Sequence, residues 1–373
     1  VHALEKNTCL KTLDLESNDI RDDAVRQVFE VLKKNTALTT LDISSNKFGM
    51  QAAEQIGMFL ETCPPLTTLS LRKNDIGRNM SSFAAGLEKN VNLTDLDLSF
   101  NHLGDSGASE MSKGLEKCSI TSLSLAGNSI GNHGASCIAA TLNNRNALIN
   151  LDLSVNHISV PGAEEIASAL QANTAIESLN LARNSIGHGS LYIAEALCNG
   201  TSLTRLNLAD NSIGKAGVRE LAYALDKNCQ LKSLNLQKNH ADRSSTENFA
   251  AALQRNVTLL DLDLGIDKSS SVAKQIKKVL EQNKVGVRVL TVRSSCTEPG
   301  TLNIACTDLS GLEVAVFKMP ATSKLNSLIT AIASKTSLSG RLRLVLSDGT
   351  LLCDQSGDLQ LFEAMPAILS EVG

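Results

Sequence analysis

Aromatic residues are scarce in this sequence. It has no tryptophan, and aromatic side chains make up only 3% of its 373 residues. A core of large rings is therefore excluded. Leu, Ile, Val and Ala must supply the buried surface instead, which indicates a narrow interior with little room for bulky side chains.

Long apolar runs and a broad basic surface are absent too. No stretch approaches the roughly 18 consecutive apolar residues of a membrane-spanning helix, and no signal peptide is visible. The net charge is −4, with acidic and basic residues interleaved. A surface suited to phosphate backbones is therefore excluded. We expect a cytoplasmic protein with no membrane span and no nucleic-acid partner.

Motifs that carry chemistry are missing as well. The nine cysteines contain no C-x-x-C pair, and neither H-E-x-x-H nor G-x-S-x-G occurs. Gly214-Lys215-Ala216 lacks the upstream glycine and the Ser/Thr of a phosphate loop. We predict no catalytic, cofactor-binding or metal-binding residues, so the protein is not expected to be an enzyme. The cysteines are interpreted as free structural thiols.

What the sequence does contain is the pattern Leu-x-x-Leu-x-Leu-x-x-Asn, which recurs along most of the chain. Leu93, Leu96, Leu98 and Asn101 form one copy. Successive closing residues are 28 or 27 positions apart. A fixed period of this length is the signature of a repeat protein. The closing residues are Asn18, Asn46, Asn74, Asn101, Asn128, Asn156, Asn184, Asn211, Asn239 and, at the tenth position, Asp267.

Each copy predicts one strand and one helix. Leu96 and Leu98 alternate with polar residues, so they point inward from a short, half-buried strand. Asn101 follows where the chain turns, and its amide can both donate and accept hydrogen bonds. We expect stacked copies to form an asparagine ladder. A helix then follows, with apolar residues at helical spacing, such as Ala108 and Met111.

A single unit cannot bury its apolar face, so the units must stack into a solenoid with parallel strands on the concave side and helices outside. The repeats resemble leucine-rich repeats of the ribonuclease-inhibitor type, which also occur in the sensor arms of NOD-like receptors and in Ran GTPase-activating protein. The resemblance covers residues 1–293. It implies an α/β fold, a right-handed horseshoe of about ten to eleven strand-helix repeats.

Both ends of the array depart from the pattern. Residues 1–7 match the back half of a repeat helix, so we expect an upstream segment that caps the first unit. The apolar position two residues after the closing asparagine becomes Ala241 and then Ser269, as is typical of terminal units. An eleventh strand is predicted from the spacing of Val287, Leu290 and Val292.

A second pattern follows residues 294–300, which have the composition of a linker. A hairpin is predicted from strands over 301–306 and 312–317. A helix over 325–333 and strands over 342–346, 351–352 and 358–362 come after it. This order resembles the ubiquitin-like β-grasp fold and covers residues 301–373. The chain does not end in the Gly-Gly of conjugated tags. The resemblance therefore implies a built-in α+β module that provides a second binding surface.

Side chains between the core leucines should form the concave surface, where a protein partner is expected to bind. One column there either solvates a crowded sheet or docks a basic partner; it reads Asp14, Asp42, Ser70, Asp97, Ser124, Asp152, Asn180, Asn207, Asn235 and Asp263. The column just before each closing asparagine is irregular and contains Phe100. This phenylalanine either packs on neighbouring loops or acts as the apolar anchor of an interface with a basic rim. The predicted partner-binding residues are Arg72, Lys73, Asp97, Phe100, Val155 and Arg183.

The leading functional hypothesis is a non-catalytic scaffold, a subunit of a larger assembly, which binds a protein partner of unknown identity on its concave face. The resemblance also implies two alternatives. One is GTPase regulation of the Ran GTPase-activating type, although the acidic tail of that family is replaced here; a GTP hydrolysis assay tests it. The other is a tubulin- or axoneme-associated protein, since tubulin-folding cofactor E also joins such repeats to a ubiquitin-like domain; co-sedimentation with tubulin tests it.

Overall fold

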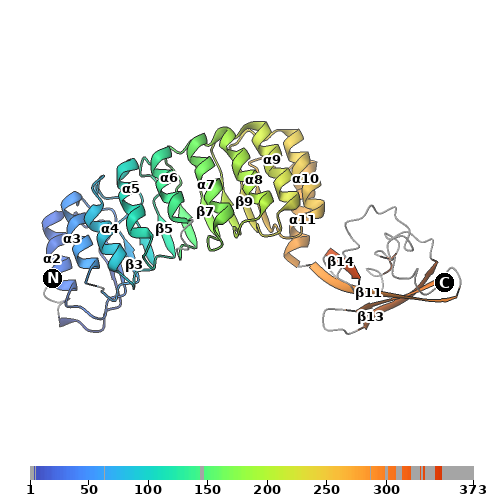
Figure 1. Cartoon of the computed structure of the whole chain (residues 1–373), viewed down its shortest axis with the longest axis horizontal. Coiled ribbons are helices and arrows are strands. Elements are labelled where there is room, and N and C mark those ends of the chain that lie inside the picture. The colour runs from blue at the N-terminus through green and yellow to red at the C-terminus, as the bar shows by residue number, and fades with distance from the viewer. Residues whose placement is uncertain are drawn as a thin grey trace. The chain divides into compact units, whose positions relative to one another are not determined.

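The computed structural model describes residues 4, 6–62, 64–142, 147–285, 287–298, 301–307, 313–320, 328, 331 and 341–346. The chain divides into two compact units, one formed by the repeats and one that contains the C-terminal sheet (Figure 1).

Ten three-residue strands of the repeat unit form one parallel sheet, in which neighbours in sequence are also neighbours in space. Each pairing aligns equivalent leucines, as with Leu96 beside Leu123. This sheet confirms the predicted solenoid of strand-helix repeats. The strands are β1 (Thr12–Asp14), β2 (Thr40–Asp42), β3 (Thr68–Ser70), β4 (Asp95–Asp97), β5 (Ser122–Ser124), β6 (Asn150–Asp152), β7 (Ser178–Asn180), β8 (Arg205–Asn207), β9 (Ser233–Asn235) and β10 (Asp261–Asp263).

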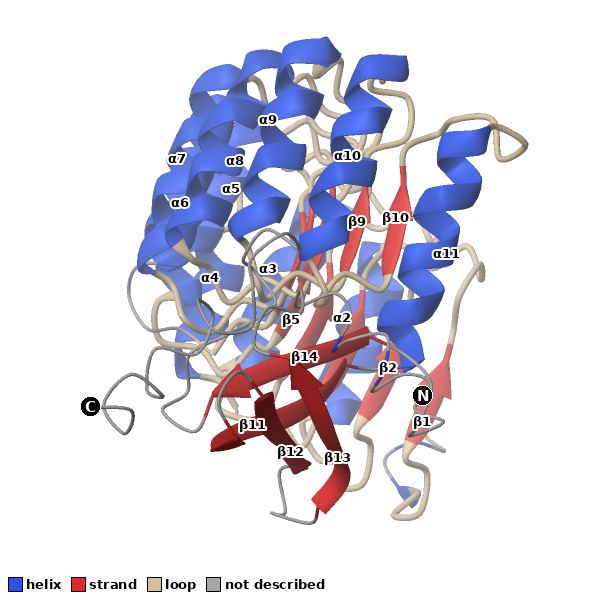
Figure 2. Ribbon diagram, turned by 90° about the vertical axis from the view of Figure 1, so that its right-hand side faces the viewer, coloured by secondary structure: helices blue, strands red, loops and turns tan. Residues whose placement is uncertain are grey.

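The helices that follow the strands line one side of the sheet, as Figures 1 and 2 show. The strand leucines point toward them, and Leu96 and Leu98 are only 1% and 0% exposed. Each helix buries one apolar stripe against the strands and its neighbours. The helices are α2 (Asp22–Leu32), α3 (Met50–Leu60), α4 (Ser81–Lys89), α5 (Gly104–Leu115), α6 (Asn132–Leu142), α7 (Val160–Ala172), α8 (Ser190–Asn199) after the short 3-10 helix η1 (Gly187–Gly189), α9 (Gly214–Lys227), α10 (Arg243–Arg255) and α11 (Ser271–Val285).

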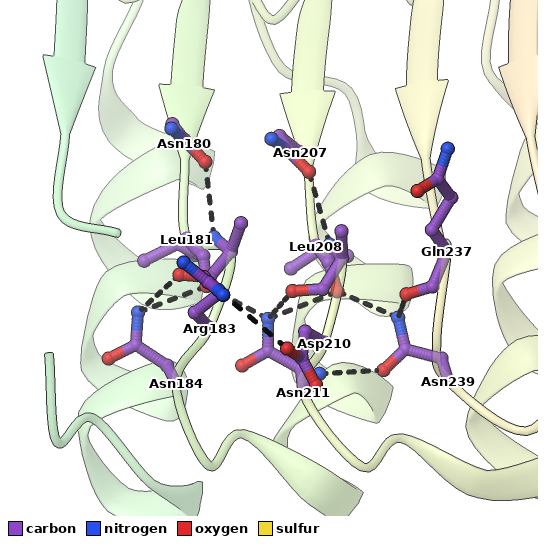
Figure 3. A network of polar contacts seen from close by, with 12 residues as sticks. Asn180, Leu181, Arg183, Asn184, Asn207, Leu208, Asp210, Asn211, Gln237 and Asn239 are labelled. Atoms are coloured by element: carbon purple, nitrogen blue, oxygen red, sulfur yellow. Dashed lines mark hydrogen bonds and ion pairs between the residues drawn. The ribbon is translucent and has the colours of Figure 1, made fainter. Parts of the chain in front are cut away.

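The predicted asparagine ladder is present at the carboxyl ends of the strands. The Nδ2 of Asn211 donates to the carbonyl of Leu208 in its own repeat at 3.0 Å and to that of Leu181 in the preceding repeat at 2.8 Å. Its backbone N–H donates to Oδ1 of Asn239 in the next repeat at 2.9 Å (Figure 3). Asn211 therefore joins its repeat to both neighbours and satisfies backbone groups that are buried.

A second set of asparagines, which the sequence analysis missed, lies in the turns between helix and strand. Oδ1 of Asn90 accepts the N–H groups of Asn92 and Leu93 at 3.0 and 2.8 Å. Its Nδ2 donates to the Leu60 carbonyl of the preceding repeat at 3.0 Å. These residues recur at multiples of the repeat length, which is the signal that could have identified them. The corresponding bonds are made by Asn35, Asn173 and Asn228.

Some helices are capped by a side chain from the preceding repeat. Oδ1 of Asp105, near the start of α5, accepts the N–H groups of Gly131 and Gly134 at the start of α6, at 2.6 and 2.9 Å. Asn132 in turn serves α7, since its Oδ1 accepts the N–H of Ser159 at 2.9 Å. Stacking thus completes the capping that these helices lack within their own sequence.

The C-terminal sheet has four strands in the order β13-β12-β11-β14, which are β11 (Val287–Glu298), β12 (Thr301–Thr307), β13 (Glu313–Pro320) and β14 (Arg341–Leu346). The hairpin predicted over 301–317 is present as the antiparallel pair β12–β13. The strand predicted over 342–346 is β14, which lies parallel to β11. Of the predicted helix over 325–333, only Leu328 and Ala331 are described, and both are helical. The strands predicted over 351–352 and 358–362 lie outside the described residues.

Strand β11 corrects two expectations. Residues 294–298 continue this strand and pair with β12, whereas the sequence analysis placed them in a linker. Val287 to Val292, expected as an eleventh strand of the solenoid, pair with β14, and residues 291 and 292 also pair with β12. The described residues therefore contain ten solenoid strands. The alternation of apolar residues is common to both kinds of strand, so spacing alone did not reveal the pairing partner.

We predict that Asn128→Ala lowers the free energy of unfolding by about 2 kcal/mol or more, because it leaves several buried backbone groups without partners. Asn128 is 0% exposed, accepts from the Asn101 N–H and donates to the Leu98 carbonyl, both at 2.9 Å. The measurement is guanidinium unfolding followed by circular dichroism.

Asn18→Ala is the matched control, because Asn18 is exposed and its amide makes one bond, to the Glu16 carbonyl at 2.9 Å. We expect it to cost less than about 0.5 kcal/mol. Equal losses for the two variants would show that the ladder does not hold the repeats together.

Candidate partner-binding face

The residue before each closing asparagine has a left-handed backbone. The φ angles lie between +52° and +66° at Ser17, Ser45, Lys73, Phe100, Gly127, Val155, Arg183, Asp210 and Lys238. This region is unfavourable for side chains other than glycine, by roughly 1–2 kcal/mol per residue, and most of all for a β-branched valine. The turn is stabilised by the asparagine that follows it. The side chains of this column, called the turn column below, are therefore placed by the backbone of the fold.

Phe100 lies between two neighbouring repeats. The guanidinium of Arg72, from the repeat before, sits over its ring at 4.8 Å from the centroid and donates to Ser99 Oγ at 3.2 Å. In the repeat after, a Cβ on Gly127 would lie 2.5 Å from two carbons of the Phe100 ring. A side chain at position 127 would thus force the Phe100 ring to move. Phe100 is half-buried. The sequence analysis left open whether Phe100 packs on neighbouring loops or anchors an interface. The structure shows it in contact with the repeats on both sides.

The remaining predicted residues spread along the turn column. Lys73 is exposed and precedes Phe100 by one repeat, and Val155 is half-buried two repeats beyond it. Arg183 is exposed, and its Nε lies 3.8 Å from Oδ2 of Asp210; Figure 3 shows these two side chains pointing toward each other. With strands about 4.8 Å apart, Arg183 lies about 14 Å from the Phe100 position. The structure brings Arg72 and Phe100 together and places Arg183 in a separate pair.

Asp97 belongs to the polar column of the strands, and its role is at least partly structural. Its Oδ1 accepts the N–H of Ser99, two residues on, at 2.8 Å. The same bond recurs along the column, in which each side chain terminates its own strand. It is made by Asp14, Asp42, Asp152, Asn180, Asn207, Asn235 and Asp263. We call the side of the sheet that carries this column, away from the helices, the strand face.

Two charged residues of the strand face were missed by the sequence analysis. Asp95 lies on β4, two residues before Asp97, and burial together with the Asp97 charge raises its pKa. Arg205 begins β8 and reaches across β7, donating to Ser178 Oγ at 3.3 Å and to Asn150 Oδ1 at 3.1 Å. The available signal was the column of first strand residues, in which Arg205 is the one arginine among small polar and acidic residues.

The described residues offer little for chemistry. Within them, no group of three or more His, Cys, Asp or Glu side chains is placed to hold a metal ion. Six described cysteines are free thiols, and burial raises the pKa of Cys118 and Cys198 and that of Cys306 to about 11. Such thiols stay protonated near neutral pH, in contrast to reactive cysteines. Among the helices described, none has the length and apolarity needed to cross a membrane.

A family model described as "Leucine Rich repeat" matches residues 6–26, 34–56, 62–78, 89–112, 116–139 and 201–222. Each matched segment contains one strand of the parallel sheet, namely β1, β2, β3, β4, β5 or β8. Within these ranges the chain consists of leucine-rich repeats. No curated protein matches its sequence.

Several solved leucine-rich repeat and related structures are similar to this chain. The leucine-rich repeat-containing protein LegL7 from Legionella pneumophila has 19% identity and a TM-score of 0.44, over 75% of this chain and 93% of that one. TLR13 in complex with ssRNA13 has 22% identity and a TM-score of 0.45, over 72% and 38%. Leiomodin-1 actin-binding site 2 has 20% identity and a TM-score of 0.33, over 48% and 88%.

We predict that Gly127→Ala destabilises the leucine-rich repeats by about 2–4 kcal/mol, since it adds a left-handed alanine and a clash with the Phe100 ring. In a Phe100→Ala background the same change should cost only about 1–2 kcal/mol, because the clash is gone. The measurement is a double-mutant cycle in guanidinium unfolding.

Gly214→Ala is the control for backbone strain alone, because Gly214 has φ +71° and a Cβ added there would meet no other atom within 4 Å. A Gly127→Ala cost that is the same with and without Phe100 would contradict the proposed packing of the ring on the glycine.

We predict that Asp95→Asn raises the thermal midpoint at pH 7. Because the folded state raises the pKa of Asp95 above its ordinary 3.8, the folded protein binds this proton more tightly than the unfolded chain. Stability is therefore lost as the pH rises through the folded pKa, and the asparagine removes that loss. At about pH 3, where the carboxyl is protonated in both states, the gain should vanish. A gain of equal size at both pH values would contradict this account.

Proposed function

We propose that the protein is a non-catalytic, cytoplasmic scaffold that holds a protein partner on the strand face of its leucine-rich repeats. In this proposal the partner contacts the surface around Phe100, with Arg72, Lys73, Asp97, Val155 and Arg183 around it. The C-terminal sheet provides a second contact.

The observation that carries the proposal is the placement of Phe100. A bulky aromatic residue occupies a left-handed turn, where it costs stability, and it is positioned by Arg72 on one neighbouring repeat and Gly127 on the other. An aromatic side chain held at low conformational entropy, with an arginine on its ring, has the composition of an interface hot spot. Its half-buried surface leaves part of the ring for a partner.

The surroundings of Phe100 support a rim of mixed polarity. Lys73 and Arg183 are exposed cations in the turn column, and Val155 adds apolar surface between them. A polar, charged rim around an apolar centre is the usual organisation of a protein interface. Asp97 lies in the same repeat as Phe100 and adds a carboxylate that can accept hydrogen bonds from the partner.

For the C-terminal unit we propose a ubiquitin-like module. The β12–β13 hairpin and the addition of β14 to the same sheet support a small α+β unit. Strand β11 lies before the range predicted for this module, so the proposed module includes it as an additional strand.

We predict that Phe100→Ala combined with Arg183→Ala reduces capture of the partner at least tenfold, a loss of about 1.4 kcal/mol or more. The experiment uses the full chain as bait, identifies captured proteins by mass spectrometry and then measures the affinity of the purified partner.

Tyr223→Ala combined with Lys227→Ala is the matched control. Tyr223 on α9 is 55% exposed and carries the Lys227 Nζ over its ring at 4.7 Å, so it reproduces the aromatic-cation pair on the helix side. We expect this variant to bind as the unaltered protein does. Unchanged affinity in the Phe100 variant, or an equal loss in the control, would refute the proposed surface.

A further inference from the structure

The polar column of the strand face changes its charge along the sheet. It carries carboxylates at Asp97 and Asp152 on β4 and β6, and amides at Asn180, Asn207 and Asn235 on β7, β8 and β9. Both kinds of side chain make the same hydrogen bond. The carboxylates accept the N–H two residues on at 2.8 Å, and the amides accept it at 3.0–3.1 Å. Figure 3 shows Asn180 and Asn207 in this position.

At these positions an Oδ1 acceptor caps the end of the strand, and either a carboxylate or an amide can supply it. A carboxylate is the stronger acceptor for a backbone N–H, so the asparagines on β7–β9 are not explained by the hydrogen bond. Their effect is to remove three negative charges from one part of the strand face.

The hydrogen bond also orients the amides. Because Oδ1 of Asn207 and Asn235 turns toward the backbone, the Nδ2 donors of these residues point away from it. The two residues lie directly beside each other on β8 and β9. They present a pair of N–H₂ groups from strands about 4.8 Å apart.

Arg205 adds a cation to the same region. Its guanidinium contacts neutral side chains, Ser178 and Asn150, which hold it flat across β7. A guanidinium has five donors, and these two bonds leave others available. Lys238 adds an exposed ammonium in the turn column.

The acidic residues nearby are Asp210, paired with Arg183, and the exposed Glu177 just before β7. Carboxylates also flank the region, Asp152 beside Asn180 on β6 and Asp261 and Asp263 on β10. The Nδ2 of Asn180 donates to Asp152 Oδ2 at 3.1 Å, so this amide is already occupied.

We propose that the strand face of β7–β9, formed by Arg205, Asn207, Asn235 and Lys238, binds a carboxylate-bearing, acidic segment of the protein partner. Here the Arg205 guanidinium and the two amide donors receive the carboxylates. This inference rests on the proposed function, since it names the chemistry of the partner held there. A nucleic acid fits less well, because a phosphate backbone requires a longer row of cations than Arg205 and Lys238 provide.

The test is the binding of a fluorescein-labelled poly-glutamate peptide to the full chain, measured by fluorescence anisotropy at low and physiological salt. The variant N180D/N207D/N235D keeps every Oδ1 acceptor but sets five carboxylates side by side, from Asp152 to Asp263. Its thermal midpoint should therefore fall, and its affinity is measured at a temperature well below that midpoint. We expect its affinity for the peptide to fall roughly tenfold or more, because three carboxylates would face the ligand. Arg205→Gln should weaken binding by a similar factor.

The matched control is Q171E/N199D/Q230E, which adds the same charge at exposed positions on the helices and their following turns. It should bind the peptide nearly as the unaltered protein does. The inference is overturned if the peptide does not bind, if N180D/N207D/N235D binds it as tightly as the unaltered protein, or if the control loses as much. Tighter binding of single-stranded nucleic acid than of the peptide would also overturn it.

The outcome is separable from that of the proposed function. Phe100→Ala should leave poly-glutamate binding unchanged, because Phe100 lies three repeats before β7. If peptide binding fails while partner capture still depends on Phe100, the acidic segment is refuted and the scaffold stands. If the peptide binds as expected but capture is indifferent to Phe100, the strand face of β7–β9 stands and the surface around Phe100 is refuted.

Discussion

The asparagine at the end of each strand is the interaction on which the rest of the repeat unit depends. From Asn46 to Asn239 its Nδ2 bonds carbonyls of two repeats. Except at Asn101, its Oδ1 also accepts N–H groups of the preceding repeat, as Asn46 does for Asn18 and Ile20 at 2.9 Å each. A turn inside the solenoid would otherwise bury backbone groups without partners, at roughly 1–3 kcal/mol each. The ladder gives these backbone groups hydrogen-bond partners in each repeat, and it also fixes the register between strands.

This ladder has a consequence for the surface. It holds the preceding residue in a left-handed conformation whatever its side chain, so the turn column can carry serine, lysine, valine or phenylalanine on the same backbone. The backbone conformation of this position is thus fixed, whereas its side chain can vary from repeat to repeat. Phe100 occupies this position with its ring in the space left by Gly127 of the next repeat, where a Cβ would clash with it.

The polar column shows the same separation of structure from surface chemistry. An aspartate and an asparagine both terminate a strand by accepting a backbone N–H, yet they differ by one charge. The solenoid can therefore vary its charge from repeat to repeat without altering its geometry. On β7–β9 the amides coincide with Arg205, whose long side chain spans two strands. Side chains of different repeats thus combine into surfaces that differ along the solenoid, although the repeats share one backbone geometry.

The repeat length, the inward leucines, the short strands and the asparagine ladder were predictable from the sequence, because each depends on residues a few positions apart in a pattern copied many times. The helix-to-strand asparagines carried the same periodic signal and were overlooked. The tertiary structure alone decided which side chains meet across repeats. Gly127 lies under Phe100, Asp105 caps the next helix, and Arg205 reaches Asn150, 55 residues away in sequence. It also decided that β11 pairs with β14, since alternating apolar residues describe a strand but not its neighbour.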